Sequence, residues 1–437
     1  MKKSFLALIS LLAWLIGSTQ TNNDSLLSEV TLEQAVEYSL KNQPAIRQSL
    51  IDQEITNANI RSRLADWYPQ VNFNYNLQHN FVVQTAIIGV NVVKLGVDNT
   101  SAAQFSMSQT LFNRDVLLAS RTRSQVRQQA RQATSNTRIE TAAEVSRAFY
   151  DVLSSIQQVK VSNQNITRIE RSLSDAYNQY KAGVTDKTDY KRASIGLNNA
   201  RALKKTNDEM LKSKLEYLKT IMGYPVNASL NIAYDSLQME KEVVIDTLQQ
   251  LDPSKRIEFM LLETQQSLLQ ANLTYMKWSY LPSLSLNGAY NFNYQNNQFS
   301  KLYNINYPNS YALLTLSLPI LQGGRRKADI QSAQLEVERN RMEMVSLRNN
   351  INSEYAAALS AYKSNLANYL ALKENLSLAQ EVYDVIQLQY RNGIKTYLEV
   401  INSETDLRTA QINYYNALYA VLSSKIDVQR ALGQINY

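Results

Sequence analysis

The residues best suited to chemistry in this chain lie in a short segment that follows a glycine. Asp186 and Asp189 stand close together just after Gly183, and enzymes use clustered carboxylates as acids and bases. An enzyme would also need a histidine, a cysteine or a phosphate-binding loop beside them. The segment has none of these. We therefore predict no catalytic residue, and an enzyme is the weakest hypothesis for this chain.

The composition argues against metal, cofactor and nucleic-acid sites. The chain has one histidine, His79, and no cysteine, so a transition-metal site, a disulfide and a lipid-modified N-terminal cysteine are all unexpected. The net charge of +7 is spread thinly over 437 residues, without a dense basic patch that contains aromatic residues. We expect no cofactor and no nucleic-acid partner.

Residues 1–19 predict a secretory signal peptide. Lys2 and Lys3 precede an apolar run over residues 5–16, and small residues follow. A retained membrane anchor is the alternative, but the apolar run is too short to span a membrane. Since no other window approaches 18 uninterrupted apolar residues, we predict no transmembrane helix.

Four segments alternate between apolar and uncharged polar residues over much of their length, which predicts β-strands with two unlike faces. They are residues 70–81, 101–112, 283–294 and 311–321. An antiparallel sheet on a soluble core would also alternate. The near absence of charge favours membrane strands, with lipid on one face and water on the other. Four strands cannot close a barrel, and an open edge is forbidden in lipid, so such a sheet requires an oligomer.

Nearly all of the remaining chain has helical periodicity. Thr31 and Gln34 form a capping box before a short helix, and Pro44 starts a second helix that ends near Asp66. A coiled-coil seam predicts a helix from Asn113 to Tyr180, on the order of 100 Å long at about 1.5 Å per residue. The segment 80–100 is expected to be an exposed loop or hairpin tip.

An internal duplication organises the chain. The seam positions between Val145 and Tyr180 recur 210 residues later, between Tyr355 and Tyr390. We predict a first repeat over residues 28–235, with a strand hairpin at 70–112 and a helical tip near 183. The second repeat covers residues 240–437, with a strand hairpin at 283–321 and a tip near 393. All strands would lie at one end and both tips at the other.

The chain resembles the TolC family of outer-membrane channel-tunnels over nearly its whole mature length. The most similar segments are 31–36 (TLEQAV), 180–189 (YKAGVTDKTD) and 390–402 (YRNGIKTYLEVIN). The resemblance implies an α+β membrane protein with a long helical coiled-coil barrel and two tandem structural repeats. It implies a homotrimer, in which four transmembrane strands per chain complete one β-barrel, in the outer membrane of a Gram-negative bacterium with a periplasmic helical tunnel.

The resemblance also implies a function and partners. The family supplies passive exit ducts for tripartite efflux pumps, working with a periplasmic adaptor (membrane fusion) protein, an inner-membrane pump and outer-membrane lipid. A component of a type I protein secretion system is the alternative within the family. A coiled-coil structural or interaction protein of the cell envelope is the alternative from another class, and the four uncharged strands argue against it.

Site residues carried over from the family lie at the two tips. Tyr390 and Lys395 match the donors of a latch that closes the periplasmic entrance, while Thr188 and Asp189 match its acceptors. Lysine at 395 replaces the family's usual arginine, so bidentate hydrogen bonding is lost. An ordinary surface ion pair at a helix turn, worth about 0–1 kcal/mol, is the alternative.

Two further sets of residues are implied by the same resemblance. Glu399 matches the first acidic ring of the constriction, and Asn402 stands where a second carboxylate is expected. A trimer would then carry three charges at the constriction rather than six. The adaptor-docking tips comprise the two turn glycines and the apolar residue after each, namely Gly183, Val184, Gly393 and Ile394.

Overall fold

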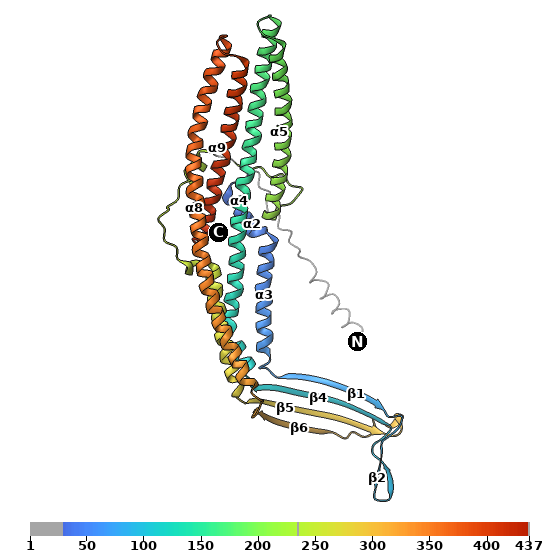
Figure 1. Ribbon diagram of the computed structural model, residues 1–437. Helices are drawn as coiled ribbons and strands as arrows, with labels where there is room; N and C mark the ends of the chain where they lie inside the picture. The colour runs from blue at the N-terminus through green and yellow to red at the C-terminus, as the bar shows by residue number, and fades with distance from the viewer. Residues whose placement is uncertain (1–28, 234–235, 436–437) are drawn as a thin grey trace.

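The computed structural model describes residues 29–233 and 236–435, and the predicted signal peptide lies outside them. The molecule is elongated, with bundled helices along most of its length and a β-sheet at one end (Figure 1). Two helices run nearly from end to end, α4 (Arg114–Lys181) and α8 (Arg325–Arg391), of 68 and 67 residues. At about 1.5 Å per residue each is on the order of 100 Å long, as predicted.

The two short helices before the first strand begin and end where the sequence indicates. The capping box of Thr31 and Gln34 is formed, and Pro44 occupies the first turn of its helix. Asn113 caps α4 through its side chain. The remaining α-helices are α2 (Leu32–Asn42), α3 (Pro44–Ala65), α5 (Lys187–Met222), α6 (Ser236–Glu242), α7 (Ile257–Lys277) and α9 (Tyr397–Ala431).

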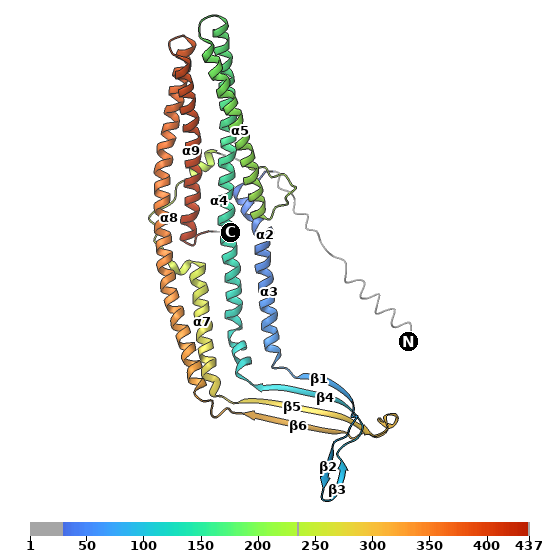
Figure 2. The ribbon, with the colours of Figure 1, turned by 45° about the vertical axis from the view of Figure 1, so that its right-hand side comes forward.

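The two halves of the chain repeat one arrangement. The first half runs from α3 through two strands into the helical hairpin of α4 and α5, and the second runs from α7 through two strands into the hairpin of α8 and α9. Both helical hairpins turn at the end far from the sheet (Figures 1 and 2). The tandem repeat is therefore confirmed as an architecture, while the domain limits 28–235 and 240–437 stay predictions.

The strands form one antiparallel sheet in the order β1-β4-β5-β6. They are β1 (Gln70–His79), β4 (Asn99–Phe112), β5 (Ser283–Asn296) and β6 (Asn309–Ser317). The fourth strand was predicted at 311–321 but ends at Ser317, because Pro319 has no N–H to donate to a strand ladder. The segment 80–100 contains a separate hairpin of β2 (Thr85–Ile88) and β3 (Asn91–Lys94).

The register places apolar residues on one face of the sheet and polar residues on the other. Residues directly opposite one another in a ladder share a face. One row across three strands is Phe73, Phe105 and Tyr290, and the next is Asn74, Gln104 and Asn291. The rings of Phe73 and Phe105 lie 4.8 Å apart. Large apolar side chains on that face are exposed, including Phe73, Phe105, Tyr290, Leu314 and Leu316.

The hydrophobic core lies at the middle of the long helices, where α4 and α9 meet the end of α5. Phe149, Leu153, Leu218 and Leu418 are fully buried there. The end of α5 depends on Gly223, which has a φ of +68°. A Cβ at this position would lie 2.7 Å from the carbonyl oxygen of Asn42, so glycine permits both the left-handed turn and the close approach of α2.

Across the part of the chain that the structure describes, no helix combines the length and the apolar character that a membrane span requires.

Candidate functional site

The two helical hairpins turn through nearly identical backbone loops. Gly183 has a φ of +72° and Gly393 a φ of +74°. In each tip the glycine N–H bonds to the carbonyl three residues earlier, and the next N–H bonds to the carbonyl five residues earlier. The residues after the glycines project into solvent, with Val184 72% and Ile394 70% exposed. These four positions are the tips that the sequence predicts as an adaptor-docking surface.

Tyr390 joins the two helical hairpins below the tips. Its hydroxyl donates a hydrogen bond to Oε1 of Gln179 on α4, at 3.1 Å, and its ring packs 5.9 Å from that of Tyr397. Burial raises the pKa of the Tyr390 hydroxyl, with Asp189 and Asp175 adding to the effect. Tyr390 therefore has the bridging position expected of a latch donor, but its acceptor within the chain is Gln179.

Lys395 pairs with a carboxylate of its own tip. Its Nζ lies 2.7 Å from Oε1 of Glu399, and Oε2 of Glu399 accepts from the backbone N–H and hydroxyl of Thr396. The pKa of Glu399 is lowered by the hydrogen bond from Lys395 and then by the backbone of Thr396. The carboxylate that matches the family's first acidic ring is therefore ion-paired within its own tip and also caps α9.

The other predicted site residues surround the first tip and the start of α9. Thr188 is exposed in the first turn of α5, where its N–H donates to the capping carboxylate of Asp186. Asp189 is half-buried, and its charge acts on both Tyr390 and Tyr397. Asn402 is exposed on α9. The structure thus brings Asp189 close to Tyr390, and their roles in a latch stay predictions.

A buried carboxyl near the tips was missed by the sequence analysis. Glu404 on α9 is only 5% exposed and accepts a hydrogen bond of 2.9 Å from the hydroxyl of Ser172 on α4. Burial raises the pKa of Glu404, and the opposing effects of Ser172 and of the nearby Arg168 are smaller. Glu404 is thus a second polar link between the hairpins. In the sequence, Glu404 stands out only as a carboxylate two residues after Asn402, the position where the family's second acidic ring is expected.

Apolar packing surrounds the Tyr390 side of this junction. Ala193, Tyr390, Tyr397 and Val400 form a small buried cluster that is separate from the core at the middle of the helices. The polar links of Tyr390 and Glu404 lie beside it, and Arg168 of α4 adds a hydrogen bond of 3.4 Å to Gln411 on α9, so the two hairpins are joined near their free ends by a small cluster and a few polar links. A junction of this kind can be opened at low cost, because little apolar surface has to be exposed.

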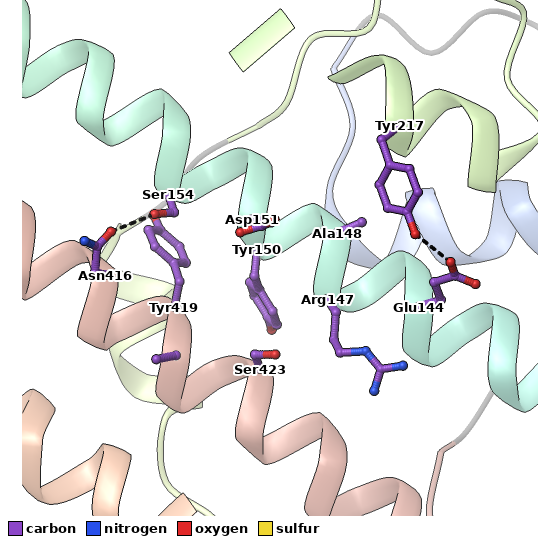
Figure 3. Close-up of a pocket in the computed structure, with 11 residues that line it drawn as sticks. Glu144, Arg147, Ala148, Tyr150, Asp151, Ser154, Tyr217, Asn416, Tyr419 and Ser423 are labelled. Carbon is purple, nitrogen blue, oxygen red and sulfur yellow. Dashed lines mark hydrogen bonds between the residues drawn. The ribbon is translucent and has the colours of Figure 1, made fainter. Parts of the chain in front are cut away.

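A cavity of about 490 Å³ lies midway along the helices, between α4, α5 and α9 (Figure 3). The hydroxyl of Tyr217 donates to Glu144 at 2.7 Å, and the hydroxyl of Ser154 donates to Asn416 at 3.1 Å. Arg147, also in its wall, is ion-paired with Asp427 at 2.7 Å. These groups are structural pairs, without the nucleophile and base arrangement that catalysis requires.

Potential metal ligands are also dispersed. Within residues 29–233 and 236–435, no three histidine, cysteine, aspartate or glutamate side chains are grouped closely enough to hold an ion.

The chain is similar to known outer-membrane proteins along most of its length. A family model described as outer membrane efflux protein matches residues 35–224 and 259–434. The chain is 21% identical over 438 residues to the outer membrane protein TolC of Salmonella enteritidis, covering 98% of this chain and 86% of the relative. It is 22% identical over 421 residues to the outer membrane protein OprJ of Pseudomonas aeruginosa, covering 94% and 85%.

The fold is also similar to a solved structure. The crystal structure of the open state of the Neisseria gonorrhoeae MtrE outer membrane channel matches with a TM-score of 0.74 and 18% identity, covering 92% of this chain and 88% of that chain. The family model spans well over half of the sequence, and both halves of the repeat carry it. The chain therefore belongs to the outer membrane efflux protein family, the family of TolC, and is an outer-membrane protein with a periplasmic helical part.

Proposed function

We propose that three copies of this outer membrane efflux protein assemble into one tube, which is the passive exit duct of a tripartite efflux pump. The reason lies in the sheet, whose edge strands β1 and β6 are open within one chain. Each unpaired backbone group in lipid costs several kcal/mol, so the edges must be closed by other copies. Three four-stranded sheets give twelve strands, more than the smallest closed barrels have.

The observation that carries this proposal is the pair of unlike sheet faces. One face presents exposed aromatic and aliphatic side chains on all four strands, and the other presents mainly asparagine, glutamine and serine, with Tyr311 and Leu313 of β6 as the large apolar exceptions. In a closed barrel the apolar face contacts lipid and the polar face surrounds water. The long helices then continue this water-filled channel through the periplasm.

The duct itself performs no reaction and is not an enzyme. An inner-membrane pump supplies the energy, and a periplasmic adaptor links the pump to the tips. Two exposed apolar residues, Val184 and Ile394, stand on matching turns at the free end of the helices, which suits a partner that contacts both hairpins. Gly183 and Gly393 hold those turns in their left-handed conformation.

The latch closes the periplasmic end in the resting duct. Tyr390 bridges α8 and α4, and a bond between the hairpins must break before they can separate. Within one chain, Lys395 is paired with Glu399 of the same tip. In the proposed latch, Lys395 would therefore bond to Thr188 or Asp189 of a neighbouring copy. Polar groups of a docked adaptor would replace these bonds. The bonds are charge-assisted or half-exposed, so another donor or acceptor can reach the same atoms.

Glu399 and Asn402 form the narrowest ring of the entrance. Three copies contribute three carboxylates, each already paired with Lys395 in the resting state. Because both residues belong to one tip, separation of the hairpins does not part them, and an adaptor that draws Lys395 away from Glu399 would expose these charges to the lumen. The duct would then favour cations more when open than when closed.

The decisive experiment measures the oligomeric state of the protein. The protein should require detergent for extraction from outer-membrane fractions, run as a heat-sensitive trimer on gels, and show three chains per particle by light scattering. In planar bilayers the same particles should form channels. A well-folded monomer in plain buffer would contradict the proposal.

A further inference from the structure

The hairpin of β2 and β3 is an exposed apolar element at the end of the sheet far from the helices (Figures 1 and 2). Between residues 81 and 97 the only charged side chain is Lys94. Phe81 is 93% exposed, Val90 at the turn is 97% exposed, and Val92 is 71% exposed. Exposed apolar groups on this scale mark a surface that another molecule covers.

Both faces of the hairpin carry apolar side chains, with Thr85 and Lys94 on the face of Ile87 and Val92 at the open end of the ladder, and Asn91 on the other face beside the turn. Ile87 lies opposite Val92, and these side chains share one face. Ala86 lies opposite Val93, and they share the other face with Ile88. A hairpin at the surface of a soluble domain keeps one face polar, and a two-stranded hairpin alone is marginally stable in water. The covering molecule must therefore contact both faces at once.

Lipid does not fit this requirement. In the described part of the chain, β2 and β3 form a two-stranded sheet of four residues each, so the outer edge of both strands carries backbone groups without a ladder partner. Hydrocarbon cannot satisfy such groups, whereas protein or water at the edges can. The cover is therefore protein that leaves the strand edges accessible to water.

The position of the hairpin points to other copies of the same chain. Its first strand begins six residues after the end of β1, the open edge at which a neighbouring copy would join the barrel. A neighbour that joins at β1 brings its own hairpin to the same rim. Three copies around one axis give each hairpin a neighbour on both faces.

We propose that the hairpins of three copies pack against one another across the outer mouth of the barrel, with Ile87, Val90 and Val92 at the contacts. This inference rests on the proposed trimer. The packed hairpins form an apolar constriction on the extracellular side, and a constriction lined by such side chains obstructs ions by excluding water. The duct would then have a second narrow point, remote from the tips.

The absence of cysteine makes a direct test possible. Val92→Cys and Val226→Cys place one thiol each at valines of equal exposure, 71% in both cases, one on the hairpin and one near the middle of the molecule. The full-length proteins are oxidised with copper phenanthroline in outer-membrane vesicles. Val92→Cys should give covalent dimers containing up to about two thirds of the chains, since three thiols around an axis can form one disulfide. Val226→Cys should stay monomeric on denaturing gels.

Light scattering of the same proteins separates the two proposals. A trimer without cross-links at Val92 or at Val90→Cys would overturn the hairpin contact and leave the trimer standing. A monomer would overturn the proposed assembly itself. As a third measurement, an environment-sensitive fluorophore on Val90→Cys should be unaffected by brominated lipids. Strong quenching would overturn the inference by showing that the hairpin is immersed in the membrane.

Discussion

At the scale of single residues, the junction below the tips depends on Tyr390, because its hydroxyl bridges the two hairpins. Replacing Tyr390 with Phe and Lys395 with Ser removes the bond to Gln179 and the ion pair with Glu399. Phe keeps most of the volume of Tyr, and Ser shortens a side chain that is 35% exposed. We expect a several-fold rise in single-channel conductance in planar bilayers. Tyr180→Phe, at the matching position of the first repeat, is the control and should conduct like the parent. If the double variant also conducts like the parent, the tips are docking surfaces only.

Glu404 predicts a dependence of stability on pH. Burial raises its pKa in the folded protein above the value of 4.5 expected when unfolded. Its contribution to the free energy of unfolding is therefore fully present below about pH 4.5 and is lost as pH rises through the folded pKa. Between the two pKa values the loss amounts to about 1.4 kcal/mol for each step of one in pH.

Glu404→Gln removes this titration while keeping the hydrogen bond from Ser172 possible. The thermal midpoint of the variant should exceed that of the parent increasingly as pH rises from 4.5 toward 8. Glu374→Gln, at an exposed position on α8, should give no such trend. A constant difference between Glu404→Gln and the parent at all pH values would contradict the assignment.

The sequence could locate these residues only in part. The 210-residue repeat and the family resemblance place Tyr390, Lys395 and Glu399 at a tip. Their partners depend on the rotational phase between helices that are far apart in sequence, so the acceptor Gln179 could not be read from spacing. Glu404 looks like any polar residue on a helix, because its burial depends on the approach of other helices, among them α4.

At the scale of elements, the strand faces can be tested by neighbouring residues. Leu286 lies opposite Leu314 on the apolar face, and Asn287 lies on the polar face. Arginine at Leu286 would point into lipid and should reduce stability by about 2–4 kcal/mol near the membrane midplane. Arginine at Asn287 would point into water and should assemble normally. Folding yield and thermal stability of the detergent-extracted protein give the comparison, and equal damage from both would mean that the faces are assigned wrongly.

The long helices and the strands could be predicted because the same hydrophobic periodicity recurs many times along each of them. The helix seams continue over tens of residues, and alternation without charge marks all four strands. The end of the fourth strand was misjudged because Leu318 and Ile320 continue the alternation past the point where Pro319 interrupts hydrogen bonding. The hairpin of β2 and β3 could be recognised only as a possible tip, since its two faces carry no contrast between polar and apolar residues.

At the scale of the whole molecule, the two repeats are joined by a charged network near the middle of the long helices (Figure 1). Arg256, before α7, is 5% exposed and bonds to both Glu258 and Glu354. Arg430 on α9 bonds to Glu354 on α8 and to Glu140 on α4. The network therefore connects the first repeat with every long helix of the second. It fixes how the halves sit against each other, while the junction near the tips stays easier to open.

This difference gives the last prediction. Glu354→Gln should remove the carboxylate shared by Arg256 and Arg430, leaving the buried Arg256 with Glu258 as its remaining ionic partner. Hydrogen bonds to charged groups of this kind are worth about 1.5–3 kcal/mol, so the thermal midpoint should fall clearly. Glu338→Gln is the matched control on α8, since its ion pair with Arg341 is exposed on both sides and should matter by less than about 0.5 kcal/mol. Channel conductance should be unchanged in both variants, because the network is remote from the tips. A conductance change in Glu354→Gln without loss of stability would mean that the halves move against each other during opening, and that the network belongs to the gate.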